Sequence, residues 1–263
     1  MLRARLLTAA VALPPLILLV CCAPVRLFST VLLVCTGLGL YEYFSLARAH
    51  NPLSPVFGLG WGMTVAVSML WSNPALIGAA LTAGLFLAFS VALRDSQPTR
   101  ALSGVSDSLL GVVYVGFLLP HLIWVRSGPD GAAWVFFVLL VAMLGDTAGY
   151  AVGRLWGTHK LIPHISPGKT LEGSGGSVLG NLCGAGLAWM WLLPQRSLVE
   201  MLCLGLVAGF LAQVGDLCES AIKRAFGAKD SGGLFPGHGG MLDRVDSLLF
   251  PTAFIYYYVA IRG

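Results

Sequence analysis

Long apolar stretches alternate with short polar breaks along the whole chain. Each stretch is close to the roughly 20 residues that a helix needs to cross a membrane. The breaks carry proline, asparagine, glycine or charge. The pattern predicts nine spanning helices, near residues 6–23, 27–47, 55–72, 75–93, 104–125, 132–153, 173–193, 198–222 and 245–262. We therefore expect an all-α fold, a polytopic bundle of membrane helices.

Two parts of this prediction have alternatives. The first stretch follows Arg3 and Arg5 and looks like a signal peptide, but Leu19 and Val20 stand where cleavage would need a small residue. We interpret it as a retained spanning helix. The alternative to nine spans is a seven-helix bundle, in which the third and fourth stretches would be fused or would not span the membrane.

Composition supports a membrane protein and excludes other classes. Only 28 of the 263 side chains are charged, 16 basic and 12 acidic, which is 11% against about 25% in soluble domains. Hydrophobic residues make up 57%, which excludes a disordered chain. The net charge of +4 is too small for a basic stripe, so we expect no nucleic-acid partner. Six cysteines without a C-x-x-C pair indicate neither a disulfide framework nor a zinc site.

Basic residues indicate the orientation in the membrane, because cytoplasmic loops are enriched in Lys and Arg. With the N-terminus in the cytoplasm, twelve of the sixteen basic residues fall on inner loops or ends and four on outer ones. This split favours nine spans, a cytoplasmic N-terminus and an outer C-terminus. It also marks two inner loops, 154–172 and 223–244.

Acidic residues divide the chain unevenly. Four lie in the first 145 residues, and eight lie in the remainder. We therefore expect residues 1–130 to form a scaffold or a lipid-facing wall. Residues 131–263 form the predicted catalytic region, with both cytoplasmic loops.

Asp146 and Asp216 fall inside apolar stretches. A charge on a spanning helix costs a few kcal/mol and normally faces a polar cavity or a partner. Gln213, Ser220 and Lys223 are three or four residues along from Asp216 or from one another and extend one polar face. The alternative is that each acid lies near a helix end and reaches cytoplasmic water.

The first inner loop combines hydroxyls, glycines and cations just before a predicted helix. Ser166, Lys169 and Thr170 stand there, and helix N-termini and glycine-flanked amides favour phosphate. The loop lacks the first glycine of a Walker A motif. The alternative is ordinary basic decoration of a cytoplasmic loop.

The second inner loop is the most informative segment. Asp243 and Asp246 are three residues apart at the start of the ninth predicted helix. With Asp216 on the preceding helix they would form a hard-oxygen site suited to Mg²⁺. Nearby basic residues and a glycine-rich turn that contains Gly239 suit a metal-bound polyphosphate. The basic residues are Lys223, Arg224, Lys229 and Arg244. A pair of acids at a solvated helix start is the plainer alternative, and His238 alone could simply cap a turn.

The segment from Ser220 to Asp246 reads S-x-x-K-R-x(4)-K-D-x(5)-P-G-H-G-G-x-x-D-R-x-D. It resembles the signature of the phosphatidate cytidylyltransferases, also called CDP-diacylglycerol synthases. Three further blocks resemble the same family: 146–150, 165–173 and 213–220. The resemblance covers residues 140–250, whereas the first 130 residues match only in hydropathy. Gly168 is a departure, because many members carry Lys there.

The resemblance implies a reaction and a site. Phosphatidic acid and CTP would give CDP-diacylglycerol and pyrophosphate, in a helical membrane enzyme whose polar cavity opens to the cytoplasm and to lipid. The family's metal-binding carboxylates correspond to Asp216, Asp243 and Asp246. These three acids and Lys223 are the predicted catalytic residues.

The chemistry explains these residue types. The attacking phosphate is already an anion, so the difficulty is to bring two anions together and to stabilise the leaving pyrophosphate. The carboxylates would hold Mg²⁺, with a second cation such as K⁺ left open. Phosphates or nucleotide would be bound by Ser166, Lys169, Thr170, Ser220, Arg224, Lys229, His238, Gly239 and Arg244. Lys169 and Thr170 suit either the lipid phosphate or the CTP tail, and the role of Asp146 stays open.

Other functions remain as alternatives. One is a cytidylyltransferase for a different lipid phosphate. Another is an ion-coupled transporter that uses Asp146 and Asp216, although the polar residues gather at the inner edge. A structural scaffold leaves residues 220–246 unexplained. We expect an integral protein of a bacterial inner membrane, in contact with membrane lipid and with its site facing the cytoplasm; a homodimer is left open.

Overall fold

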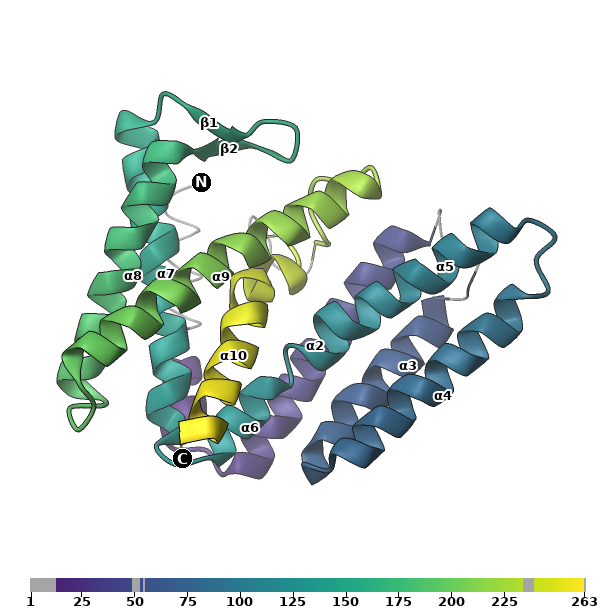
Figure 1. Ribbon diagram of the computed structural model, residues 1–263, viewed down its shortest axis with the longest axis horizontal. Helices are drawn as coiled ribbons and strands as arrows, with labels where there is room; N and C mark the ends of the chain where they lie inside the picture. Colours follow the sequence, from purple (N-terminus) through teal and green to yellow (C-terminus); the bar gives the residue numbers. More distant parts are fainter. Residues whose placement is uncertain (1–12, 49–52, 54, 234–238, 263) are drawn as a thin grey trace. The chain divides into compact units, whose positions relative to one another are not determined.

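A computed structural model describes residues 13–48, 53, 55–233 and 239–262 of the chain. The described part is almost entirely helical (Figure 1). The helices are α2 (Val25–Ala47), α3 (Pro55–Ser68), α4 (Pro74–Ala92), α5 (Pro98–Gly111), α6 (His121–Ser127), α7 (Gly131–Trp156), α8 (Leu171–Trp191), α9 (Leu198–Ala225) and α10 (Leu242–Arg262). A 3₁₀ turn, η1 (Met69–Trp71), continues α3, and a π-helical segment, η2 (Val112–Phe117), follows α5.

The apolar stretches predicted from residue 27 onward each coincide with helical structure. Residues 13–21 are helical too, and the start of that stretch lies outside the described residues. Five helical segments are long and apolar enough to cross a membrane: 25–47, 74–92, 98–127, 131–156 and 198–225. The prediction of an integral membrane protein holds at this level, whereas the count of nine spans stays a prediction.

Four predicted spans are not among those five. Part of the first, 6–23, lies outside the described residues, and the other three have visible reasons. The apolar helix 55–71 is short. Both α8 and α10 have 21 residues, but α8 is rich in glycine and serine, and α10 begins with charged residues. These features lower the hydropathy of each segment.

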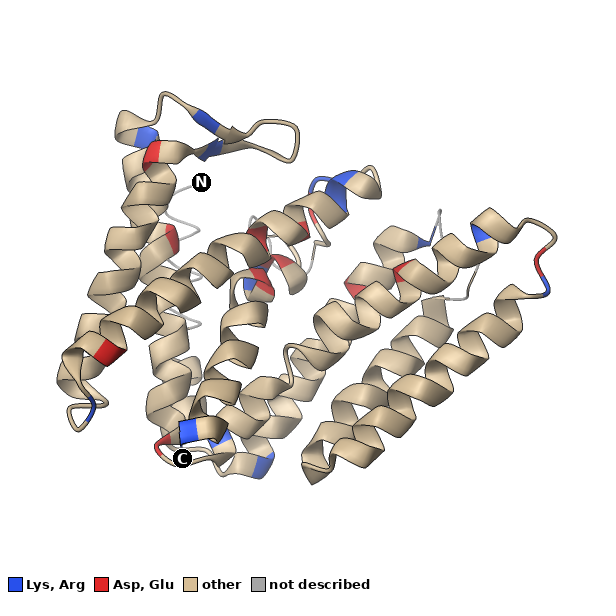
Figure 2. Cartoon of the chain, viewed as in Figure 1, with Lys and Arg blue, Asp and Glu red and all other residues tan. Residues whose placement is uncertain are grey.

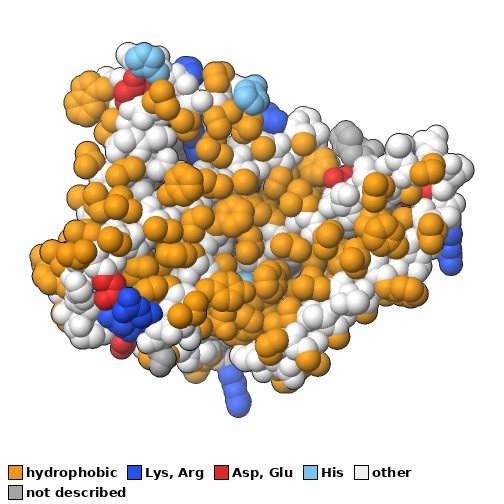
Figure 3. All heavy atoms as spheres, in the orientation of Figure 1, with side chains coloured by type: hydrophobic (Ala, Val, Ile, Leu, Met, Phe, Trp, Pro, Cys, Tyr) orange, Lys and Arg blue, Asp and Glu red, His pale blue; other side chains and the backbone are white. Residues whose placement is uncertain are grey.

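Surface chemistry agrees with a lipid environment. Hydrophobic side chains cover much of the visible face in Figure 3, and Val56, Phe86 and Trp191 are each at least 70% exposed. Figure 2 shows that α3 and α4 carry no charged residue along their lengths. Large apolar areas of this kind are rare on soluble monomers.

The chain folds into two compact units, which are described separately below. Unit 1 comprises Met1–Trp124 and Ala225–Arg244, and unit 2 comprises Val125–Arg224 and Val245–Gly263. Residues 225–244 of the second inner loop therefore belong to unit 1, although the sequence grouped that loop with the catalytic region. The predicted division of roles at residue 130 stays a prediction.

Unit 1 is held together by aromatic donors that reach carbonyl groups on neighbouring helices. The Tyr43 hydroxyl on α2 donates to the carbonyl oxygen of Asp107 on α5 at 2.8 Å. The Trp61 indole on α3 donates to the carbonyl oxygen of Ala80 on α4 at 3.1 Å. Buried Tyr and Trp normally find such partners, and here they fix the register between helices.

Unit 2 is built on a close pair of helices, α7 and α8. A Cβ atom at Gly180 of α8 would lie only 2.3 Å from the carbonyl oxygen of Leu144 on α7, and one at Gly173 would lie 2.9 Å from the carbonyl oxygen of Gly149. Small residues let membrane helices approach to this distance. The glycines of α8 therefore let it pack closely against α7.

A short β-hairpin joins these two helices, which the all-α prediction did not include. Strand β1 (Lys160–Ile162) pairs antiparallel with β2 (Ser166–Thr170), with Lys160 opposite Thr170. The strands are short, and Pro167 and Gly168 interrupt any alternating pattern, so local sequence predicted a loop. Figure 1 shows the hairpin at the joined ends of α7 and α8.

Two interactions fix the base of the hairpin. The Thr170 side chain caps α8 by accepting from the Gly173 amide at 3.1 Å. The Glu172 carboxylate accepts from the Thr158 hydroxyl at 2.8 Å and contacts His159 Nδ1 at 2.6 Å. The strand that carries Lys169 is thereby held at the start of α8.

Candidate active site

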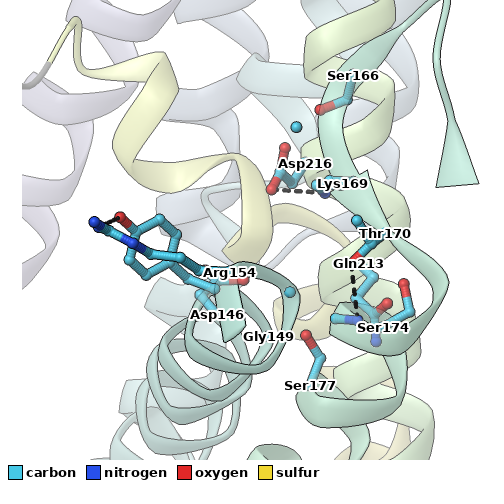
Figure 4. Close-up of a pocket in the computed structure, with 14 residues that line it drawn as sticks. Asp146, Gly149, Arg154, Ser166, Lys169, Thr170, Ser174, Ser177, Gln213 and Asp216 are labelled. Carbon is cyan, nitrogen blue, oxygen red and sulfur yellow. Dashed lines mark hydrogen bonds and ion pairs between the residues drawn. The ribbon is translucent and has the colours of Figure 1, made fainter. Parts of the chain in front are cut away.

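A cavity of about 510 Å³ opens within unit 2 (Figure 4). Four elements line it: Asp146 and Arg154 come from α7, Lys169 from β2, Ser177 from α8 and Asp216 from α9. The predicted substrate residues Ser166 and Thr170 line it as well. The cavity therefore gathers polar side chains from three separate sequence blocks.

An ion pair crosses this cavity. Lys169 Nζ lies 2.8 Å from Asp216 Oδ2, and the two side chains are 26% and 29% exposed. Figure 4 shows them pointing toward one another. The sequence predicted a phosphate contact for Lys169 and a metal contact for Asp216, but not that the two would pair. The ammonium group of Lys169 thus neutralises the Asp216 carboxylate.

Three acids of unit 2 lie close enough to interact electrostatically: Asp146, Asp216 and Asp246. Ser247 of α10 lies beside Asp146 of α7, so these two helices also meet near the acids. A Cβ atom at Gly215 would lie 2.4 Å from the carbonyl oxygen of Asp246, so α9 and α10 touch beside the acids. Like charges this close favour a cation among them.

The polar face of α9 continues beyond Asp216. The Ser220 hydroxyl lies 3.5 Å from Asp216 Oδ1. Further along, Lys223 Nζ lies 2.5 Å from Glu219 Oε2, and both side chains are largely buried, at 11% and 1% exposed. Lys223, predicted to act on phosphates, is thus engaged in a buried ion pair within its own helix.

Arg224 joins α9 to the hairpin. Its Nε donates to the carbonyl oxygen of Ile165 at 3.3 Å. Two predicted phosphate-binding cations belong to unit 1 instead: Lys229 and Arg244 are both exposed there. His238 lies outside the described residues.

Asp243 is held firmly inside unit 1. Its Oδ2 accepts from the Ser231 amide at 3.1 Å, the Ser231 hydroxyl at 2.8 Å and the Gly240 amide at 2.8 Å. Gly239 has φ +75°, and a Cβ atom there would lie 2.3 Å from Asp243 Oδ2. Only glycine fits this turn without strain.

Glu42 on α2 belongs to the same cluster, and the sequence did not point to it as a site residue. It is 6% exposed. Its Oε1 accepts from the Met241 amide at 2.8 Å, and its Oε2 accepts from the Leu242 amide at 2.8 Å and from the Ser231 hydroxyl at 3.0 Å. One feature of the sequence could have identified Glu42: it is the one acidic residue of an apolar helix, and such a residue is costly without a partner.

A sequence model of the cytidylyltransferase family matches residues 3–262. The chain belongs to the cytidylyltransferase family. A phosphatidate cytidylyltransferase of Brucella suis is 35% identical over 235 residues, which cover 88% of this chain and 84% of the relative. A phosphatidate cytidylyltransferase of Staphylococcus epidermidis is 42% identical over 142 residues, 54% of each chain. The uncharacterized protein YnbB of Escherichia coli is 36% identical over 230 residues, covering 84% of this chain and 75% of YnbB.

The donor atoms of this cytidylyltransferase suit Mg²⁺ only in part. Across the described ranges, no three His, Cys, Asp or Glu side chains gather closely enough to hold a metal ion. Mg²⁺ is usually bound by one or two carboxylates, with waters and substrate phosphates completing its shell. Asp216 and Asp246 supply carboxylates of the required kind beside the cavity. They fit Mg²⁺ if the substrates bring the remaining oxygens.

Glu172, at the base of the hairpin, has a perturbed acidity. Hydrogen bonds from His159 and Thr158 hold the pKa of this carboxyl well below its usual range. They stabilise the charged form. The carboxylate is therefore ionised, and its hydrogen bonds hold the base of the hairpin to the start of α8.

Proposed function

We propose that this cytidylyltransferase transfers the cytidylyl group of CTP to phosphatidic acid, giving CDP-diacylglycerol and pyrophosphate. One observation carries the proposal: a cavity at the start of α8 brings Lys169 and Asp216 together, beside Asp146. A phosphate-binding cation and a cation-binding carboxylate are the two groups that this transfer requires. The relatives from Brucella suis and Staphylococcus epidermidis, named as phosphatidate cytidylyltransferases, support the same substrate.

The reaction needs charge neutralisation more than proton transfer. A phosphate oxygen of phosphatidic acid attacks the α-phosphorus of CTP, and the bond between that phosphorus and the bridging oxygen of pyrophosphate breaks. The nucleophile is already ionised, so no general base is required. Two anions must nevertheless approach, and the leaving group gains charge. Residues that hold cations or donate to phosphate therefore dominate the site.

The carboxylates of Asp216 and Asp246 are the proposed holders of Mg²⁺, which when bound would offset the charge of the phosphates. Asp243 is proposed as a further ligand on the sequence motif alone. The Lys169 ammonium would leave Asp216 as a cation arrives there and turn to a substrate phosphate. Lys169 would thus neutralise either the carboxylate or the phosphate, according to occupancy.

The remaining polar residues keep the roles that the sequence suggested. Phosphate or nucleotide contacts are proposed for Ser166, Thr170, Ser220, Lys223, Arg224, Lys229, His238, Gly239 and Arg244. A second cation such as K⁺ is also proposed for the site. Thr170 and Lys223 would combine such contacts with their observed partners, the Gly173 amide and Glu219.

The membrane arrangement is proposed on the same basis. Nine spans with a cytoplasmic N-terminus place the predicted inner loops, and hence the site, at the cytoplasmic face of a bacterial inner membrane. CTP would enter from water, and phosphatidic acid from the bilayer. A homodimer is compatible with this arrangement.

The decisive experiment uses the full chain purified in detergent. Incubated with CTP, dioleoyl phosphatidate and Mg²⁺, it should release pyrophosphate and form CDP-diacylglycerol, and EDTA should stop both. Parallel reactions with an isoprenoid phosphate or an ether-lipid phosphate test the alternative acceptors. Turnover with one of these and none with phosphatidate would replace the proposed substrate. Full turnover in EDTA would contradict the metal assignment.

A further inference from the structure

Glu42 lies in a segment that looks like plain scaffold. Helix α2 is apolar, and Glu42 is its one acidic residue. The side chain is nevertheless buried, at 6% exposed. A buried carboxylate in a spanning helix needs hydrogen-bonding partners to offset the loss of water. Its partners therefore show what the helix contributes to the protein.

Those partners all belong to the loop and first turn that carry the sequence signature. Glu42 accepts from the backbone amides of Met241 and Leu242, each at 2.8 Å. These amides stand at the start of α10, where N–H groups have no partner within the helix. A carboxylate there also interacts favourably with the helix dipole. Glu42 thus holds the start of α10 from a position 200 residues away in the chain.

The loop is shaped around this carboxylate. A Cβ atom at Gly240 would lie 2.3 Å from Glu42 Oε2, and one at Gly232 would lie 2.9 Å from Glu42 Oε1. Side chains at either position would push the acid away. Both glycines thus leave room for the carboxylate.

Ser231 connects Glu42 to Asp243. Its hydroxyl oxygen lies 3.0 Å from Glu42 Oε2 and 2.8 Å from Asp243 Oδ2. A hydroxyl has one proton, so it donates fully to only one of two ionised carboxylates at a time. The Gly240 amide donates to the same Asp243 oxygen at 2.8 Å, and Gly240 is adjacent to Met241, which donates to Glu42. Any displacement of Glu42 therefore reaches Asp243 by two routes.

We propose that Glu42 is a positioning residue, which sets the orientation of the Asp243 carboxylate through Ser231 and the turn at Gly240. The inference rests on the proposed function, in which Asp243 is a metal ligand. It deepens that function by adding an N-terminal helix to the metal-binding machinery. Groups that orient a ligand typically change metal affinity by about 10- to 100-fold when mutated.

Mn²⁺ binding to the full chain in detergent, with CTP present, tests the proposal. Free Mn²⁺ measured by electron paramagnetic resonance gives the affinity without any turnover. Glu42→Gln keeps the size but places an amide against backbone N–H groups, and it should weaken Mn²⁺ binding about 10-fold or more. Ser231→Ala removes only the bridging hydroxyl and should weaken binding about 3-fold, below the range expected for losing the whole positioning group.

A matched control is available in Glu200→Gln. Glu200 is also an acid on an apolar helix, but it contacts Tyr258 and Arg196. This variant should bind Mn²⁺ as the unmodified chain does. The thermal unfolding of each variant is measured as well. If Glu42 only held α2 and α10 together, its loss would change the thermal stability and leave the Mn²⁺ affinity unchanged.

Wild-type Mn²⁺ affinity in Glu42→Gln would overturn the inference, as would an equal loss in Glu200→Gln. If Glu42→Gln does not fold, Ser231→Ala decides, and unchanged affinity there overturns it. Unchanged affinity in Asp243→Asn also overturns it, because Glu42 would then have no ligand to position. Weakened Mn²⁺ binding in a protein that makes no CDP-diacylglycerol would instead support the inference and contradict the proposed reaction.

Discussion

Asp216 and Asp243 are both proposed metal-binding acids, but the two units hold them in different ways. Asp216 pairs with the flexible ammonium of Lys169, and both side chains keep about a quarter of their surface exposed. Asp243 accepts three hydrogen bonds from Ser231 and Gly240, two of them from the backbone. A lysine can turn away when a competing cation arrives, whereas backbone donors move only with their loop. One carboxylate is therefore in an exchangeable setting and the other in a fixed one.

The largest expected effect comes from the exchangeable carboxylate itself. Asp216→Asn keeps the shape but removes the charge that attracts both Lys169 and a metal ion. We expect CDP-diacylglycerol formation to fall by more than about 100-fold, beyond the range for residues that only orient a ligand. The measurement is turnover in detergent at saturating Mg²⁺.

Asp130→Asn is the control for that experiment. Asp130 accepts a hydrogen bond from Gln195 at 3.0 Å, outside the cavity lining. Its turnover should stay close to that of the unmodified chain. Near-normal turnover in Asp216→Asn would remove the exchangeable carboxylate from the mechanism.

The fixed setting can be broken at Gly239. An alanine there would have to adopt φ +75° and place its Cβ 2.3 Å from Asp243 Oδ2. Left-handed backbone strain costs about 1–3 kcal/mol, and the contact pushes Asp243 aside. We expect a higher Mg²⁺ requirement and lower thermal stability. Gly233→Ala, which meets no atom within 4 Å, should show neither change, and equal behaviour of the two variants would contradict the fixed setting.

Lys169→Met sharpens the comparison, because its two effects have opposite signs. Losing a charged contact to phosphate should raise the KM for a substrate about 10-fold, in line with the 1.5–3 kcal/mol of charged hydrogen bonds. Losing the competitor at Asp216 should leave Mg²⁺ affinity equal or stronger. Lys160→Met, on the neighbouring strand, is the control. A weaker Mg²⁺ affinity in Lys169→Met would show that Lys169 supports Asp216 rather than competing for it.

The smallest effect concerns Glu172, a third acid, held by exposed partners. Its pKa lies below the usual range because His159 and Thr158 donate to the charged form. A depressed pKa gives stability that is present above the unfolded value of about 4.3 and is lost as pH falls toward the folded value. Glu172→Gln should therefore have a slightly lower melting temperature than the unmodified chain near neutral pH. This difference in melting temperature should disappear as the solution is acidified below about pH 4. A difference in melting temperature that persists at low pH would show that Glu172 stabilises the protein through packing and not through its charge.

Hydrophobic length made the helices predictable. A membrane requires apolar segments of defined length, so most stretches from residue 27 onward matched the observed helices to within a few residues. The fifth, predicted at 104–125, begins at Pro98 and is divided into α5, η2 and α6. The hairpin was not predicted, because its strands of three and five residues are too short to show an alternating pattern.

The site was only partly predictable, since its key contacts link distant segments. Residue types and spacing brought out Lys169, Asp216 and Asp246, and unit 2 gathers them around or beside one cavity. Nothing local revealed that Lys169 pairs with Asp216, because the hairpin that carries it was not predicted. Glu42 was assigned to scaffold because its partners lie about 190–200 residues further along.

Thr170 ends strand β2 and also caps α8, so the chain has no slack between the strand and the helix. Lys169 is the residue just before this junction and cannot follow a substrate by backbone movement. Its reach is the length of one lysine side chain. In the proposed reaction, a substrate phosphate that replaces Asp216 as the partner of Lys169 must therefore come within the length of one lysine side chain of this junction. A substrate whose phosphate stays farther from the junction could not form this contact, so the proposed role of Lys169 carries a limit of distance as well as of charge.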